Sequence, residues 1–180
     1  ATMNEQMHYY MAKAEQKAML DPLTGIGNKG AFRSAAEDVL TLYPNNYGVL
    51  VMDVNNLKKV NDELGHEEGD RFLLETVKLL KHMLGNTPVY RIGGDEFATP
   101  LTEKTTEKAT QKKIETYFYQ NMSNWNEKHK DFLPWGLWIA VGFAEVNPAA
   151  HETFSDVFRR ADNNMYENKK QLKEKFSHST

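Results

Sequence analysis

The sequence contains no cysteine among its 180 residues, which excludes disulfide frameworks, thiolate metal sites and cysteine nucleophiles. It also has no apolar run approaching the roughly 18 to 20 residues that a membrane-spanning helix requires, and its first residues do not place an apolar segment after a basic one. We therefore predict no direct membrane contact by this chain and a cytoplasmic location. A longer protein that contains this chain can still be anchored in a membrane through other segments.

The sequence has no strong excess of charge of either sign. It contains 22 lysines and arginines and 25 aspartates and glutamates, which gives a formal net charge of -3. Such a balance gives no global attraction to nucleic acid, so we predict no nucleic-acid partner. Any phosphate site must be built locally from a few basic side chains. With 40% hydrophobic residues, the chain can bury one substantial core, which predicts one domain with a short appendage.

Residues 1–20 predict a helix with a short apolar stripe. Apolar side chains recur there at alternating spacings of four and three: Met3, Met7, Tyr10 and Ala14. This spacing is typical of a helix that pairs with a partner. Because the stripe is short, a terminal helix lying on its own domain is an equally good interpretation.

Beyond residue 20, hydrophobic patterns and turn residues predict a succession of helices and strands. A turn-rich segment over 21–28 leads into a helix capped by Asn28. The further expected helices are 54–64, 70–83, 102–130 and 153–175. The expected strands are 47–52, 89–92, 97–101 and 135–146, of which the middle two form a β-hairpin. Helices interleaved with strands around a hairpin predict an α+β sheet rather than a doubly wound parallel fold.

Three acidic residues follow the ends of expected strands: Asp53, and at the hairpin tip Asp95 and Glu96. Magnesium usually takes one or two protein carboxylates and completes its coordination with water and substrate phosphate, so this set fits a nucleoside triphosphate site. Gly93 and Gly94 precede the hairpin acids, and glycine allows both close approach of a ligand and the positive φ that such turns need. Solvated turn residues are the alternative interpretation.

Four lysines lie where their amines can neutralise phosphate charge. They are Lys58, Lys59, Lys169 and Lys173, of which the last two share one helix face. Asn61 and Asp70 flank Gly65-His66 and can reach one pocket if this segment turns back. A carboxylate accepts hydrogen bonds from the two adjacent donors of guanine, and an amide satisfies the remaining positions. Ordinary solvent-facing side chains are the alternative for each of them.

Five segments, in chain order, resemble the motifs of the GGDEF domain family, the diguanylate cyclases. They are 21–28 (DPLTGIGN, similar to DxLTGLxN), 53–62 (DVNNLKKVND, similar to DxDxFKxxND), 65–70 (GHEEGD, similar to GHxxGD), 91–97 (RIGGDEF, with the GGDEF signature) and 160–169 (RADNNMYENK, similar to RADxALYxAK). Ordered matches from residue 21 to residue 173 are not expected by chance.

The resemblance implies a palm-like nucleotidyl cyclase fold of the α+β class. Its central, mostly antiparallel sheet is of ferredoxin-like βαββαβ type and is flanked by helices. The implied domain covers 21–176, after an N-terminal signalling or linker helix over 1–20 and before a tail over 177–180. Such a helix implies fusion to an upstream sensory domain.

The resemblance also implies a reaction, in which two GTP molecules condense into cyclic di-GMP with release of two pyrophosphates. Each of two facing domains binds one GTP, so that each 3′-hydroxyl attacks the α-phosphorus of the opposite nucleotide. Catalysis therefore needs a homodimer. A divalent metal, Mg²⁺ or Mn²⁺, would lower the pKa of the hydroxyl and stabilise charge on the phosphoryl oxygens.

Roles for individual residues follow from their positions in these motifs. The implied metal ligands are Asp53, Asp95 and the backbone carbonyl of Val54, with Glu96 assisting. The implied catalytic residues are Asp95, Glu96 and Lys58, and either acid is a candidate proton acceptor. The implied substrate-binding residues are Asn61, Asp70 and His66 at guanine, Lys58, Lys169 and Lys173 at the phosphates, and Leu57, Gly93 and Gly94 along the site.

The sequence departs from the family pattern at several positions. Asn55 and Leu57 stand where the family usually has aspartate and phenylalanine. Lys173 keeps the positive charge of the usual arginine but loses its bidentate fork. Residues 84–87 (LGNT) replace the RxxD motif with which many members bind product, so we predict little product inhibition through this site.

Other functions would require different features in the sequence. The main alternative is a non-catalytic GTP-binding regulatory GGDEF domain, but such members usually carry a damaged signature and this one is intact. A cyclase for a mixed dinucleotide would need a changed base-reading residue, whereas Asp70 favours guanine. A purely structural domain would not need these acids beside a double glycine.

Overall fold

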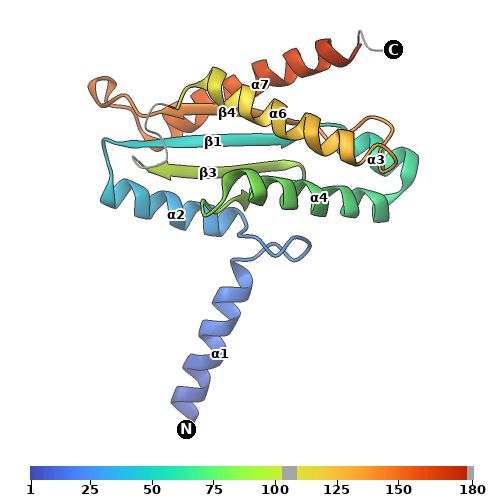
Figure 1. Cartoon of the computed structure of the whole chain (residues 1–180). Coiled ribbons are helices and arrows are strands. Elements are labelled where there is room, and N and C mark those ends of the chain that lie inside the picture. Colours follow the sequence, from blue (N-terminus) through green and yellow to red (C-terminus); the bar gives the residue numbers. More distant parts are fainter. Residues whose placement is uncertain (103–108, 178–180) are drawn as a thin grey trace.

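The computed structural model describes residues 1–102 and 109–177 (Figure 1). Its helices are α1 (Met3–Ala18), α2 (Lys29–Leu42), α3 (Leu57–Leu64), α4 (His66–Leu84), α6 (Gln111–Lys128) and α7 (Phe154–Ser177), with a 3₁₀ turn at Pro148–Ala150. Its strands are β1 (Tyr47–Val54), β2 (Tyr90–Arg91), β3 (Glu96–Thr102) and β4 (Ile139–Glu145).

The strands form one sheet in the order β2-β3-β1-β4, and every neighbouring pair is antiparallel. From β1 to β4 the chain runs strand, helices, two strands, helix, strand, which is the βαββαβ order. The α+β class and the central antiparallel sheet are thus confirmed. The predicted hairpin is confirmed as well, because Tyr90 of β2 lies opposite Ala98 of β3.

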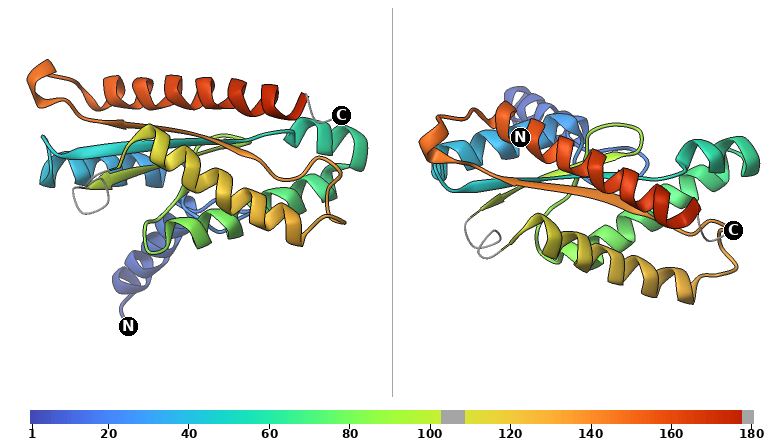
Figure 2. Two further views of the ribbon diagram at one scale, coloured as in Figure 1. Left: turned by 45° about the horizontal axis from the view of Figure 1, so that its top comes forward. Right: turned by 90° about the horizontal axis from the view of Figure 1, so that it is seen from above.

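The central strand β1 is buried along its whole length and carries core residues on both faces. Successive side chains of a strand point to opposite faces. Leu50 and Met52 therefore join a core with residues of α4 and α6, whereas Val49 and Val51 pack with residues of α7. Figure 2 shows α7 on one side of the sheet and α4 and α6 on the other. Burial on both faces fixes the register, and with it the place where β1 ends.

Helix α7 lies very close to β4. A Cβ atom at Gly142 would overlap backbone atoms of Ala161 and Met165, so only glycine allows this approach. Asn168 Oδ1 also accepts a hydrogen bond of 2.9 Å from the Val141 amide. These contacts hold α7 on the sheet and place Lys169 beside the end of β1.

Several element boundaries differ from the sequence prediction. Helix α4 begins at His66 rather than at Asp70, because Gly65 takes a φ of 92° that ends the preceding helix and lets the next one start at once. The helix expected over 102–130 begins only at Gln111, capped by the Thr110 hydroxyl, while Thr102 belongs to β3. Residues 103–108 of that prediction lie outside the described residues.

The two ends of the chain also differ from expectation in detail. The strand expected from 135 begins at Ile139, and α7 runs from Phe154 to Ser177, past the predicted end. Residues 178–180 of the predicted tail lie outside the described part of the chain. Helix α2 is capped by Asn28 as predicted, since its Oδ1 accepts a hydrogen bond of 3.1 Å from the Ala31 amide.

Helix α1 projects away from the sheet and has no buried residue (Figure 1). Its largest exposed apolar side chains include Met3 at 83%, Tyr10 at 69% and Met7 at 56% exposure. The interpretation that this helix lies on its own domain is therefore wrong. Its apolar stripe remains uncovered in a single copy of the chain.

Candidate nucleotide site at the end of the sheet

The acidic residues from two segments meet at one end of the sheet. In the β1–β3 pairing Asp53 lies opposite Glu96, and the Val54 amide donates a hydrogen bond of 3.0 Å to the Asp95 carbonyl oxygen. The hairpin tip is thereby held against the last residues of β1. The expected proximity of the two segments is confirmed.

Negative charge accumulates at this end of the sheet. Burial, followed by the charge of Asp95, raises the pKa of Asp53 from 3.8 to about 6, although Lys169 opposes the shift. Burial and the charges of Asp162 and Asp95 likewise raise the pKa of Glu96. Raised carboxyl pKa values mean that the surrounding groups do not fully compensate the ionised acids, so the site favours an added cation.

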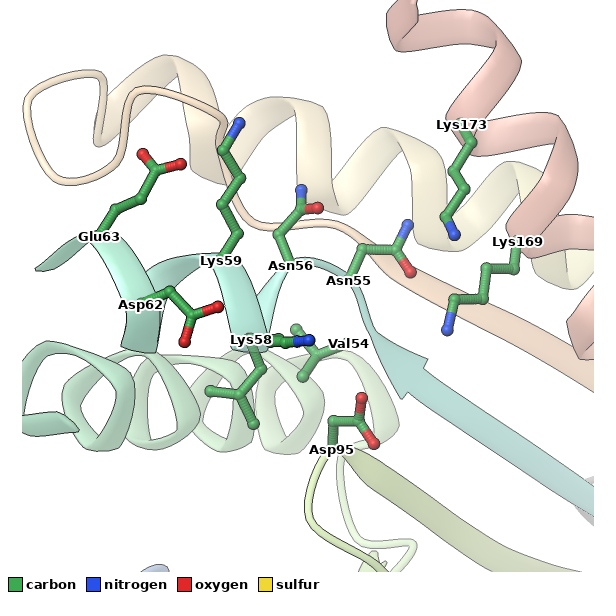
Figure 3. A pocket seen from close by; sticks show the side chains of 11 residues that line it. Val54, Asn55, Asn56, Lys58, Lys59, Asp62, Glu63, Asp95, Lys169 and Lys173 are labelled. Carbon is green, nitrogen blue, oxygen red and sulfur yellow. The ribbon is translucent and has the colours of Figure 1, made fainter. Parts of the chain in front are cut away.

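A pocket of about 430 Å³ opens beside Asp95. Figure 3 shows the side chains that line it. Acidic, amide and basic side chains surround it. Its lining consists of Val54, Asn55, Asn56, Leu57, Lys58, Lys59, Asp62, Glu63, Asp95, Lys169 and Lys173. Amines from α3 and α7 therefore meet the acidic end of β1 across one cavity. The pocket lining thus includes the lysines to which the resemblance assigned phosphate binding, Lys58, Lys169 and Lys173.

The residues expected to read guanine lie outside the lining of this pocket. Asn61 packs at the junction of α3 and α4, where a Cβ atom at Gly69 would overlap its Oδ1 atom. Asp70 follows Gly69 directly, and both Asp70 and His66 are exposed. Asn61 therefore lies close to the start of α4, as the sequence predicted. The three residues expected to read guanine, however, lie on the surface outside the pocket that the lysines line.

The double glycine differs from expectation in one respect. Neither Gly93 nor Gly94 has a positive φ, so the prediction that this turn needs that conformation is wrong. In the part of the chain that the structure describes, no atom beyond the two adjacent residues lies within 4 Å of the position that a Cβ of Gly94 would occupy, whereas one at Gly93 would lie 3.2 Å from Glu96 Oε2. The open space at Gly94 leaves the backbone accessible to a ligand.

Arg91 connects the signature turn to the start of the domain, a role that sequence reasoning missed. Its Nη2 and Nε donate hydrogen bonds of 2.8 and 3.2 Å to the Gly94 carbonyl oxygen. Its Nη1 lies 3.2 Å from both carboxylate oxygens of Asp21, which also accepts hydrogen bonds from Thr24. The signal was present, because Asp21 and Arg91 open two of the recognised motifs.

Asn55 is a second residue whose importance sequence reasoning missed. Its side chain is buried, and its Oδ1 has no hydrogen-bond partner among the described residues. A buried acceptor without a partner costs free energy unless water, an ion or a ligand satisfies it. Asn55 lines the pocket, but this oxygen is itself covered, so a group bound in the pocket would reach it only after a local movement of the side chain.

The donor set fits a divalent cation whose coordination a substrate completes. Among the described residues, no three histidine, aspartate or glutamate side chains converge into a ready-made metal site. Magnesium rarely has such a site in nucleotide enzymes, since one or two carboxylates suffice when phosphate and water supply the other ligands. Asp53 and Asp95 would supply the carboxylates of such a partial set, with the Val54 carbonyl as the further predicted ligand.

Within the described residues, no helix combines the length and apolar character needed to cross a bilayer. This agrees with the composition of the sequence. It leaves open what adjoins this chain in a longer protein.

Comparison with characterised proteins places these features in a family context. The chain is 33% identical to the diguanylate cyclase DgcN of Escherichia coli over 173 residues, which cover 91% of this chain and 40% of DgcN. It is 28% identical to the diguanylate cyclase DgcS of Shewanella oneidensis, covering 85% of this chain and 50% of DgcS. The chain thus spans half or less of these relatives.

Solved structures with the same fold include two in complex with cyclic di-GMP. The coiled coil and GGDEF domain of DgcB from Caulobacter crescentus superposes with a TM-score of 0.74 at 21% identity, covering 93% of this chain and 88% of that one. A microbial GGDEF domain superposes with a TM-score of 0.66 at 29% identity, covering 88% and 94%.

The family model described as "Diguanylate cyclase, GGDEF domain" matches residues 18–175, which is nearly the whole chain. The matched range includes the residues at the acidic end of the sheet, the lysines of α3 and α7, and Arg91. We conclude that the chain belongs to the GGDEF domain family of diguanylate cyclases.

Proposed function

We propose that this chain is a catalytic GGDEF domain that condenses two GTP molecules into cyclic di-GMP and two pyrophosphates. The observation that supports this most directly is a pocket lined by Asp95 and four lysines, next to the buried carboxylate of Asp53. Carboxylates suit a divalent cation and amines suit a triphosphate, so one site offers complementary groups to both. The intact signature and the relatives named diguanylate cyclases favour the same reaction.

The phosphates of GTP would lie against the amines of Lys58, Lys169 and Lys173. Mg²⁺ or Mn²⁺ would be held by Asp53, Asp95 and the Val54 carbonyl, with help from Glu96. Such a cation supplies positive charge that stabilises the phosphoryl oxygens and lowers the pKa of the attacking hydroxyl. Asp95 and Glu96 are the candidate acceptors for the proton that this hydroxyl loses.

The base of GTP would lie toward the junction of α3 and α4. Asn61 and Asp70 are neighbours there, and the exposed Asp70 carboxylate can accept the two donors of the guanine edge. His66 and Leu57 would border the base and the sugar. The accessible backbone at Gly94 leaves room for the nucleotide on the opposite side.

Catalysis would require two copies of the domain facing each other, because each pocket holds one GTP and both nucleotides must react. The uncovered apolar stripe of α1 is a surface through which two copies can associate. An upstream sensory domain would act by changing how often the two pockets meet.

The experiment that tests this function is product analysis. Purified protein at high concentration is incubated with GTP and Mg²⁺ or Mn²⁺, and the nucleotides are separated chromatographically. The Asp95→Ala/Glu96→Ala double variant should lose product formation by roughly 100-fold or more, whereas Asp131→Asn, an exposed substitution outside the pocket lining, should match the original chain.

Two results would redirect the interpretation. Equal product from the original chain and the double variant would mean that these acids do not carry the reaction. GTP binding without product, even when a fused leucine zipper enforces dimers, would favour a non-catalytic regulatory domain.

A further inference from the structure

Lys169 links α7 to the acidic end of β1 through an ion pair. Its Nζ lies 3.3 Å from Asp53 Oδ1, and the two side chains are 26% and 7% exposed. Figure 3 shows the Lys169 side chain extending from α7 into the pocket. A positive charge therefore rests against a largely buried carboxylate.

The carboxylate that Lys169 contacts is also a proposed metal ligand. Asp95 and Glu96 add negative charge around Asp53, so the nucleotide-free site needs a neutralising cation. Lys169 is the cation that the described part of the chain supplies to Asp53 by direct contact. A divalent cation on Asp53 would lie near this ammonium, and two positive charges so close repel each other strongly in a partly buried site.

Lys169 has a second position available within the same pocket. It lines the cavity together with Lys58 and Lys173, where the phosphates would bind. Lysine carries a compact charge on a flexible stem, so its amine can move between neighbouring anions without movement of the helix. Helix α7 itself is held on β4 by the close contact at Gly142.

We propose that Lys169 takes the place of the divalent cation in the nucleotide-free domain and moves to the nucleotide phosphates when that cation binds Asp53. This inference rests on the function proposed above. The exchange couples two binding events, because the cation drives Lys169 toward the phosphates and the phosphates draw Lys169 away from Asp53. Such a coupling is reciprocal, so each ligand tightens the binding of the other.

The test measures Mn²⁺ binding to the nucleotide-free protein by the electron paramagnetic resonance signal of free Mn²⁺. Lys169→Met removes the competing charge and should tighten Mn²⁺ binding by roughly tenfold. Lys173→Met is the matched control, since it removes the same charge from the same helix and the same pocket without a contact to Asp53. Its effect should be much smaller.

A second measurement tests the coupling. With 3′-deoxy-GTP present, and after correction for Mn²⁺ bound by free nucleotide, the original chain should gain more Mn²⁺ affinity than Lys169→Met does. Unchanged Mn²⁺ affinity in Lys169→Met, or an equal gain in Lys173→Met, would refute the exchange while leaving the metal site intact. If Asp53→Asn binds Mn²⁺ as well as the original chain, the metal site itself is wrong and the exchange falls with it.

Discussion

At the scale of single residues, Asp53 shows how the site opposes the stability of the fold. Its pKa rises from 3.8 to about 6, chiefly through burial. A carboxyl group with a raised pKa holds its proton more tightly in the folded chain than in the unfolded one. Its contribution to stability is therefore complete below about pH 4 and is lost as the pH rises through 6. The proposed binding of a divalent cation at neutral pH would require the ionised and destabilising form.

Asp53→Asn should consequently stabilise the metal-free domain. In buffer with a chelator at pH 7.5, we expect the free energy of unfolding to rise by on the order of 1 to 3 kcal/mol. The gain should shrink toward zero near pH 4, where Asp53 is protonated. Urea denaturation at both pH values measures it, with the exposed Asp131→Asn as the control that should change little. A less stable Asp53→Asn at pH 7.5 would contradict this account of the site.

Arg91 leads to a second prediction at the residue scale. Its guanidinium is only 16% exposed, and its partner Asp21 is 14% exposed. Arg91→Ala removes the guanidinium that bonds to the Gly94 carbonyl and to the Asp21 carboxylate, which keeps only its bonds from Thr24, and this loss should cost about 1 to 3 kcal/mol in urea unfolding. Arg159→Ala removes an exposed ion pair between neighbouring turns of α7 and should cost less than about 0.5 kcal/mol. Equal effects of the two substitutions would show that the Arg91 contact is not structural.

At the scale of elements, sequence patterns predicted what local periodicity controls. The apolar run at 47–52 and the Asn28 cap produced β1 and α2 as expected. The start of α4 was misplaced because Gly65 breaks the helical pattern, whereas the next helix begins directly after it and Gly69 lies inside this helix against Asn61. The burial of Asn55 could not be predicted, because a polar residue after a strand gives no local sign that it will lie inside the fold, where its backbone amide donates to the Trp138 carbonyl oxygen.

The site could be predicted in its composition but not in its geometry. The recognised motifs supplied Asp53, Asp95 and the lysines, and the sheet register brings these segments together. The ion pair between Lys169 and Asp53 depends on how closely α7 approaches the sheet. That distance is set by Gly142, a residue that no motif includes.

Helix α1 provides a prediction about association. If its stripe pairs two copies, Met7→Glu together with Tyr10→Glu should shift sedimentation equilibrium toward monomers, because charges would face each other across an apolar seam. Neither side chain is buried within one chain, so the circular dichroism spectrum should not change. Ala12→Glu, on the opposite face of α1, is the matched control. Unchanged association of the double variant would mean that dimers form through another surface.

At the scale of the whole molecule, the missing product-binding motif predicts weak regulation by cyclic di-GMP. Residues 84–87 begin at the last residue of α4 and continue past Gly85, which closes the helix with a φ of 58°. In calorimetry without GTP, the chain should bind cyclic di-GMP weakly, and Leu84→Arg with Thr87→Asp should tighten binding by restoring the pattern. Tight binding by the original chain would contradict the prediction.

The central claim is that GTP and a divalent cation share the acidic end of this sheet, and one measurement tests it most directly. Crystals grown with Mn²⁺ and 3′-deoxy-GTP, which lacks the attacking hydroxyl, would locate the metal by anomalous scattering. The account predicts an anomalous peak between Asp53 and Asp95, with phosphates against Lys58, Lys169 and Lys173. A nucleotide bound elsewhere, or phosphates in this pocket with no metal near Asp53, would contradict it.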